Sequence, residues 1–314
     1  MFAGGEGLSS QWHSLQAVKW QMRILHLDLG HQMRGGQRQA LRLVRALRDL
    51  GHDAVLMARA GSPLQQHCQP FSIPKLLTQY RGFDIVHAHD ARSHSLAALL
   101  PGARLVVARR VAFPIRTGPA SRWKYGRAAH FIAVSEFVRG RLLEAGVEPA
   151  RISVVPDGVE LPAEAAPPAD PPRVVAVATS DPMKGSALAR EAAGRAGVPV
   201  HFARDLALEL PGASLLVYVT REEGLGSGAL MAMAAGVPVV ASRVGGLPEI
   251  VEDPVNGLLV ENTVESIAGA IRRLLDAPEQ ARRMGLAGRE RVAARFTVEI
   301  MVEKTLAVYR KVLS

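Results

Sequence analysis

Short apolar runs alternate with amphipathic stretches along most of the chain. The runs are rich in Val, Ile and Leu, and their length is typical of strands buried in a parallel sheet. They lie at residues 23–30, 53–59, 84–90, 104–110, 130–135 and 152–158, and again at 173–180, 198–204, 213–220, 237–242 and 257–260. This order predicts repeated βαβ units, and therefore an α/β fold.

The stretches between the runs predict helices and one break between two domains. Residues 37–51 carry apolar side chains at helical spacing and end at a glycine. Residues 161–173 contain five prolines, which fit neither a helix nor a sheet ladder, so we interpret them as an interdomain linker. We therefore expect two Rossmann-like domains, at 22–165 and 166–314, facing each other across a cleft. The second ends in a long helical tail, from about residue 263 to 313.

Composition agrees with a folded chain of this size. Of the 314 residues, 48% are hydrophobic and 21% charged, which is typical of a globular protein. Cys68 is the only cysteine, so a disulfide framework is excluded and a reducing, cytoplasmic location is expected. No apolar run reaches the roughly 18 residues of a membrane span. We interpret residues 1–21 as a leader or a start-site artefact.

The positive charge is concentrated in the first half of the chain. Residues 22–165 hold 20 Lys and Arg against 11 Asp and Glu, whereas residues 166–314 hold 17 of each. Such asymmetry predicts an acidic partner for the first domain, and the alternative is an Arg-rich genome that uses Arg for solubility. The densest basic patch interleaves cations with aromatic rings, as at a membrane interface. Its members are Arg109, Arg110, Arg116, Arg122, Trp123, Lys124 and Arg127.

Two motifs follow strands of the first half. Gly35 and Gly36 come between the first strand and a helix, where bare backbone and the helix N-terminus suit an anion, and an ordinary tight turn is the alternative. His87 and His89 share one face of a strand end. Histidine can hydrogen-bond to a hydroxyl, although strand histidines are also structural. Because His89 lies nearer the carboxyl end of its strand, it is the better candidate for a cleft residue.

Two more motifs follow strands of the second half. Lys184 precedes a glycine at a βα turn, where an ammonium group could clamp a pyrophosphate or could simply face solvent. Glu223 opens the loop "EGLGSGALMAMAAGVPVVAS", in which glycines precede a helix that starts near Ser227. The amide groups of this loop can hold a diphosphate, and the carboxylate can accept hydrogen bonds from sugar hydroxyls.

From residue 22 onward the chain resembles the family 4 retaining glycosyltransferases of the GT-B fold. The resemblance depends on "RGGQRQALRLVRALRDLGH", "DIVHAHDARSH", "FIAVSEFVRGRLLEAGVEPARISVVPDGVE", "EGLGSGALMAMAAGVPVVASRVGGLPEIV" and "NGLLV". The stretch from residue 109 to 136 is similar to members of lipopolysaccharide or other cell-surface glycan assembly. The resemblance implies transfer of a sugar from a nucleotide diphosphate to a glycan or lipid-linked acceptor, without a metal or another cofactor.

The resemblance also implies roles for single residues. Gly35 and Gly36 would lie near the donor phosphate or the acceptor, and His89 near the transferred sugar. Lys184 would clamp the diphosphate and Glu223 would bind the sugar hydroxyls. The backbone around Ser227, Gly228 and Ala229 would hold the phosphates. His89 and Glu223 are therefore the catalytic candidates.

Three departures from the family pattern raise a second hypothesis. Met231 occupies the place of a second glutamate that grips the nucleotide ribose, and Thr179 occupies the place of an arginine. The C-terminal domain is trimmed, since the chain after residue 185 is too short for one further strand and helix. The alternative is a degenerate member that binds a glycan, a lipid or a partner protein without catalysis. The sequence shows no recognisable module for nucleic acid, so a nucleic-acid partner is not expected.

Overall fold

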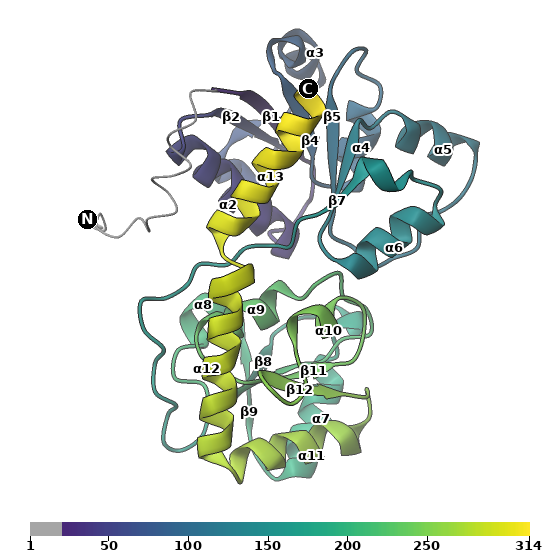
Figure 1. Cartoon of the computed structure of the whole chain (residues 1–314). Coiled ribbons are helices and arrows are strands. Elements are labelled where there is room, and N and C mark those ends of the chain that lie inside the picture. The colour runs from purple at the N-terminus through teal and green to yellow at the C-terminus, as the bar shows by residue number, and fades with distance from the viewer. Residues whose placement is uncertain (1–20) are drawn as a thin grey trace.

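The computed structural model describes residues 21–314, and the predicted leader lies outside that range apart from its last residue. The chain forms two α/β units, one above the other in Figure 1. The first unit is built on a sheet of seven parallel strands in the order β3-β2-β1-β4-β5-β6-β7. These strands are β1 (Arg23–Asp28), β2 (Asp53–Ala58), β3 (Gln69–Pro70), β4 (Ile85–Ala88), β5 (Leu105–Arg109), β6 (His130–Ala133) and β7 (Ile152–Val154). All of them except the short β3 lie within predicted runs.

Helices cover both faces of this sheet, as parallel strands require. They are α2 (Gly35–Asp49), α3 (Ile73–Gln79), α4 (Ala91–Ala97), α5 (Pro119–Gly126) and α6 (Glu136–Glu144). Helix α2 ends as predicted, because Gly51 adopts the left-handed conformation (φ +86°) that side chains with a Cβ disfavour. Its apolar side chains Leu43, Val44 and Leu47 are fully buried under the sheet.

The second unit is built on a sheet of five parallel strands in the order β12-β11-β10-β8-β9. These strands are β8 (Val174–Val177), β9 (Val200–Ala203), β10 (Leu215–Tyr218), β11 (Val239–Ser242) and β12 (Gly257–Val260), and each lies within a predicted run. One helix, α7 (Ser186–Ala196), connects β8 to β9. This short connection agrees with the trimmed domain expected from the sequence.

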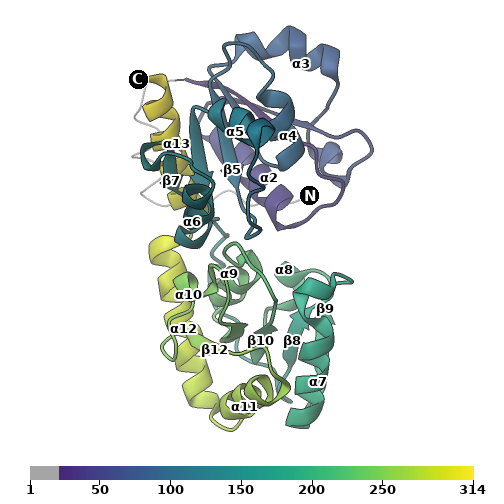
Figure 2. The ribbon, with the colours of Figure 1, turned by 90° about the vertical axis from the view of Figure 1, so that its right-hand side faces the viewer.

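The predicted helical tail is divided into three helices. The helices of the second unit are α8 (Leu206–Glu209), α9 (Ser227–Ala234), α10 (Leu247–Ile250), α11 (Val264–Leu275) and α12 (Pro278–Arg295), and the last helix of the chain is α13 (Val298–Leu313). Pro278 begins α12, and Thr297 caps α13 by accepting a hydrogen bond from the amide of Ile300. Figure 2 shows α12 along the lower unit and α13 along the upper one.

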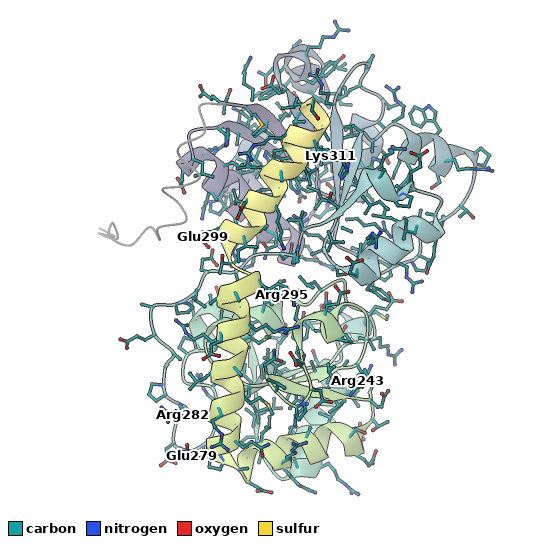
Figure 3. The ribbon with its side chains drawn as sticks, in the orientation of Figure 1. Arg243, Glu279, Arg282, Arg295, Glu299 and Lys311 are labelled. Carbon is teal, nitrogen blue, oxygen red and sulfur yellow. The ribbon has the colours of Figure 1, made fainter. Side chains whose placement is uncertain are left out.

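The chain therefore crosses between the units twice, at neighbouring points. Val159 pairs with Thr297 in an isolated parallel bridge, and its amide donates to the carbonyl of Phe296. Figure 3 labels Arg295 and Glu299, which lie on either side of the second crossing. Beyond it, Met301, Leu306 and Tyr309 of α13 join the core between α2 and the first sheet. Residues 298–313 thus pack on the N-terminal unit although they follow the C-terminal one.

Among the described residues, no helix is long and apolar enough to cross a membrane.

Candidate functional site

A cleft of about 1060 Å³ lies between the two units. Its walls are formed by the segments that follow β1, β4 and β5 of the first sheet and β8 and β10 of the second. Ligands of open α/β sheets bind at these carboxyl ends, because loops and helix N-termini gather there. The predicted cleft is therefore present.

The N-terminus of α9 faces the cleft with backbone alone. Gly226 has φ +108°, and a Cβ on Gly228 would lie 2.7 Å from the ring of Tyr218, so both positions require glycine. Ser227 and Gly228 line the cleft, whereas the side chain of Ala229 is buried behind them. The amide of Leu230 is the first in α9 to make an intrahelical hydrogen bond, to the carbonyl of Gly226. The amides of Ser227 and Ala229 lie at the positive end of the helix, where an anion is stabilised, and the amide of Gly228 lies beside the hydroxyl of Tyr218.

Lys184 and Glu223 meet beside this helix. The ammonium Nζ lies 2.7 Å from Oε2 of Glu223, whose side chain is 13% exposed. Tyr218 donates its hydroxyl proton to the same oxygen at 2.9 Å, and the amide of Gly224 donates to Oε1 at 3.1 Å. Burial, followed by the charge of Glu223, raises the pKa of Tyr218 well above its ordinary value, so the phenol stays a donor. The carboxylate thus accepts three hydrogen bonds and keeps lone pairs for a ligand.

The glycine pair of the first unit lies opposite α9. A Cβ on Gly35 would come within 3.0 Å of Oγ of Ser227, so the backbone at the start of α2 faces the start of α9 across the cleft. Gly36 also lines the cleft. Asp28 anchors the turn before α2, because its carboxylate accepts hydrogen bonds from the amide of Gly30 and the side chain of Gln37. Two helix N-termini therefore face the same space.

Three histidines pack behind the cleft wall. His26 lies on β1, His87 lies on β4, and His89 follows β4. His26, His87 and His89 are all buried, and their ligand atoms lie within 4.8 Å of one another. Nδ1 of His26 lies 2.9 Å from Nε2 of His89, and Nδ1 of His87 lies 2.6 Å from the hydroxyl of Tyr309 on α13. Burial lowers the pKa of His26 to about 3, and it lowers the pKa values of His87 and His89 well below the ordinary value. The rings are neutral at physiological pH.

The partners of His89 fix where its proton lies. Arg110 approaches Nδ1 of His89 at 3.2 Å, and a guanidinium can only donate. The proton of the neutral ring is therefore on Nε2, from which it is donated to His26. Both nitrogens are occupied, so His89 must release one partner before it can bind a sugar hydroxyl. The same argument applies to a metal ion, since the one lone pair of His89 already accepts from Arg110.

Arg110 is the cation nearest to this part of the cleft. Its Nε donates to Oδ1 of Asp157 at 2.9 Å, in an ion pair whose two side chains are 13% and 9% exposed. Burial raises the pKa of the Asp157 carboxyl, and Arg110 opposes that rise. The pattern of cations and rings places Arg110 in a surface patch and predicts no role for Asp157. The buried pair instead connects the segment after β5 to the segment after β7 and lines the cleft.

The basic patch is thus divided between two places. Arg116, Arg122, Trp123 and Arg127 are exposed on or beside α5. Arg109 is not part of that surface: it lines the cleft and donates to the hydroxyl of Tyr125 at 3.3 Å and to the carbonyl of Phe113. Lys124 is half-buried and also lines the cleft. Of the expected patch, only the exposed members form a surface around α5.

The two residues that depart from the family pattern both lie in the cleft wall. Met231 is half-buried on α9, one helical turn beyond Ser227, and Thr179 follows β8. The hydroxyl of Thr179 accepts a hydrogen bond from the amide of Asp181 at 3.1 Å, so it supports the local turn. Neither side chain supplies the charge that the family pattern has there. Tyr218 and Tyr309 were missed because they lie within a strand and a helix that the sequence marks only as apolar.

The fold and the cleft define a two-domain α/β protein of the GT-B type. Residues 65–162 match the family model described as Glycosyltransferase Family 4, and residues 149–277 match the model described as Glycosyl transferases group 1. The chain belongs to the family 4 glycosyltransferases, as the sequence motifs indicate.

Relatives of known sequence are similar over parts of the chain. The alpha-maltose-1-phosphate synthase of Mycolicibacterium smegmatis is 40% identical over 141 residues, which are 40% of this chain and 36% of that protein. The D-inositol 3-phosphate glycosyltransferase of Segniliparus rotundus is 43% identical over 102 residues, which are 32% of this chain and 22% of that protein. The similar segments thus span about a third or less of these relatives.

Solved structures share the whole fold at low sequence identity. The structure of Anabaena HepE in complex with UDP-glucose has a TM-score of 0.79 at 18% identity. The match includes 92% of this chain and 100% of the HepE chain. The lipopolysaccharide outer core galactosyltransferase WaaB has a TM-score of 0.70 at 13% identity, with the same coverage. These likenesses establish the arrangement of the two units.

Proposed function

We propose that the protein is a retaining glycosyltransferase, which moves a sugar from a nucleotide diphosphate to an acceptor hydroxyl. One observation carries the proposal: the N-terminus of α9 and the pair formed by Lys184 and Glu223 lie together in the cleft, opposite Gly35. A diphosphate needs positive charge and free amides, and its sugar needs a hydroxyl acceptor. This site supplies all three within one cavity.

The proposed chemistry uses the donor's own phosphate. The bond between the anomeric carbon and the phosphate oxygen breaks, and the acceptor oxygen bonds to that carbon on the same face. The acceptor proton passes to the leaving phosphate oxygen. The protein then has mainly to stabilise the charge that develops on the diphosphate, which Lys184 and the amides of Ser227 and Gly228 would do. Glu223 would hold the sugar by its hydroxyls.

His89 takes a changed place in this proposal. With both ring nitrogens occupied, it positions Arg110 at the cleft wall and reaches the sugar only if one hydrogen bond is exchanged. No step of the proposed transfer passes through a metal ion, and the absence of a metal requirement stays a prediction. Dialysis against a chelator should leave turnover unchanged.

For the acceptor, we propose a cell-surface glycan or a lipid-linked glycan reached at the inner membrane face. The basic excess of residues 22–165 and the exposed rings of Phe113 and Trp123, 53% and 51% exposed, support an anionic, partly apolar surface. A relative from Corynebacterium glutamicum, 46% identical over 83 residues, is named for a phosphatidylinositol monomannoside. Flotation with anionic vesicles is the test, and equal recovery with neutral vesicles would exclude the membrane surface.

Met231 and Thr179 favour a second candidate, a degenerate member that binds a glycan, a lipid or a partner protein without catalysis. Calorimetry and hydrolysis assays with common nucleotide sugars separate the two. The transferase proposal expects binding of at least one donor and slow hydrolysis of it. In the variant Lys184→Gln, kcat should fall by about a hundredfold or more, the loss typical of one electrostatic donor. If no common nucleotide sugar binds and none is hydrolysed, the transferase proposal is wrong and the second candidate is favoured.

A further inference from the structure

A second pocket lies on the N-terminal unit next to the interdomain cleft. It has a volume of about 560 Å³ and includes Ala91 and Lys124, which also line the cleft. A molecule in the pocket could therefore extend past Lys124 towards the space where the sugar is proposed to bind. Leu29, Phe71 and Leu96 form its apolar part.

The polar part of this pocket is cationic. Arg59, Arg92 and Lys124 line it, and no acidic side chain does. Within residues 21–314, none of the three takes part in an ion pair. The nearby carboxylate of Asp90 accepts instead from the backbone amides of Leu29, Arg92 and Ser93. Three positive charges thus surround one cavity without a paired anion.

The two arginines converge on the same small region. The Arg92 guanidinium donates to Nε2 of the His31 ring. The charge of Arg59, followed by loss of solvent and by the charge of Arg92, lowers the pKa of His31. Lys124 lies on α5, and its Nζ donates a hydrogen bond to Oγ of Ser95 on α4 at 3.2 Å. Like charges held this close repel, and a bound anion would relieve the repulsion.

We propose that this pocket binds a phosphoryl group carried by the acceptor, and so fixes an anionic substrate beside the transfer site. Calling the ligand the acceptor rests on the proposed function. The binding of a phosphoryl group in this pocket does not depend on it. Guanidinium groups pair with phosphate oxygens in bidentate geometry, and the two of them here offset the charge of a phosphoryl dianion, with one ammonium beside them. The apolar residues suit the carbon chain to which that group is attached.

Inorganic phosphate is the first probe, with the full-length protein and NMR signals of the arginine Nε–Hε groups as the readout. The signals of Arg59 and Arg92 should shift in a saturable way as phosphate is added. The double variant Arg59→Gln/Arg92→Gln should bind phosphate at least tenfold more weakly, with an unchanged thermal midpoint. Its affinity for a nucleoside diphosphate should stay the same, because neither residue lines the interdomain cleft.

A matched control removes the same charge elsewhere. Arg45 and Arg104 are exposed and line neither pocket, so Arg45→Gln/Arg104→Gln should bind phosphate as the wild type does. If both double variants bind phosphate equally weakly, or if the arginine signals do not shift on addition of phosphate, the pocket does not bind a phosphoryl group. Failure of every nucleotide sugar to bind, with the phosphate response intact, would instead overturn the proposed function alone.

Two further probes identify the source of the phosphoryl group. sn-Glycerol 3-phosphate tests a soluble acceptor, and phosphatidylglycerol vesicles, compared with phosphatidylcholine vesicles, test a lipid. A response to either one that is lost in Arg59→Gln/Arg92→Gln supports the proposal and names the source. Responses to both probes that are retained in that variant contradict it.

Discussion

The side chain of Glu223 is already engaged before any sugar could arrive. Lys184, Tyr218 and the amide of Gly224 all donate to it. Its place in the cleft could be predicted, because it opens the loop that follows an apolar run typical of a buried strand. Its partnership with Tyr218 could not, since a tyrosine at the end of an apolar run is compatible with simple packing.

His89 shows how far the role of a single residue can be predicted from the sequence. Its position at a strand end was clear from the sequence, but its chemistry depends on partners that are 63 and 21 residues away, His26 and Arg110. Which nitrogen carries the proton follows from the hydrogen bonds of the folded chain. A motif of two histidines therefore predicts the place of the ring and not its role.

Met231→Glu should restore a carboxylate to the cleft wall on α9. If that position faces the nucleotide ribose, a new hydrogen bond to a charged acceptor contributes about 1.5–3 kcal/mol. Donor affinity should then rise by about ten- to a hundredfold, measured by calorimetry. Met231→Leu keeps the apolar volume and should leave the affinity unchanged. An unchanged affinity in Met231→Glu would show that the ribose lies elsewhere.

Buried histidines should make the free energy of unfolding depend on pH. Burial lowers the pKa of His130 to about 4, against 6.5 for an exposed ring. Between these values the unfolded chain binds a proton that the folded chain does not, so stability falls as the pH drops from 6.5 towards 4 and is constant above 6.5 for this group. Each such ring adds a slope of up to about 1.4 kcal/mol per pH unit.

Urea unfolding between pH 4.5 and 7.5 measures this slope. His130→Gln can keep the hydrogen bond to Ser153 but cannot be protonated, so its slope should be shallower than that of the wild type. His67 is exposed, and His67→Gln serves as the control. The same slope in all three proteins would contradict the assignment of a neutral, buried His130.

At the scale of whole elements, the strands were the most predictable feature. A run of buried Val, Ile and Leu admits few alternatives, so the strands of both sheets lie where the pattern places them, whereas the two-residue, exposed β3 was missed. The tail was predicted as one long helix because its apolar spacing continues across the breaks. The structure divides it at Pro278 and Thr297, where a fixed backbone angle and a side-chain cap each start a new helix.

Helix α6 is held across the units by one carboxylate. Glu249 of α10 accepts hydrogen bonds from the amides of Glu136 and Phe137, both at 2.8 Å, at the N-terminus of α6. Loss of this charged cap should cost about 1 kcal/mol. In Glu249→Ala we expect a thermal midpoint lower by about 2–4 °C and faster hydrogen exchange of those two amides.

Glu144 provides the comparison, because it lies on the same helix and pairs with Arg141 only at the surface. Such exposed pairs contribute about 0–1 kcal/mol. Glu144→Ala should therefore leave the exchange of the first turn of α6 unchanged. Equal exchange in both variants would mean that Glu249 does not hold the two units together.

At the scale of the whole molecule, the two sheets and the cleft were predictable, and the return of α13 was not. The spacing of the apolar residues of α13 is compatible with packing on the first sheet or on the second. Its partner is decided in the folded chain, where Tyr309 meets His87 and Lys311 donates to the carbonyl of Ala150. Contacts over such distances along the chain leave no local pattern.

This arrangement predicts how the protein responds to a cut in its linker. A protease site inserted after residue 166 lies in an exposed segment, and cleavage there breaks only one of the two crossings. The fragments should elute together in gel filtration, because α13 stays packed on the first unit. They should separate in concentrated urea. Separation without denaturant would contradict the packing of α13.

Synthesis on the ribosome gives the packing of α13 another consequence. The first sheet is translated early, yet residues 298–313, which pack against one of its faces, are made only after the second unit. That half cannot finish folding while the second half is being made, although domains usually fold in the order of their synthesis. A nascent chain stalled before residue 298 should therefore keep exposed apolar surface and bind chaperones until release.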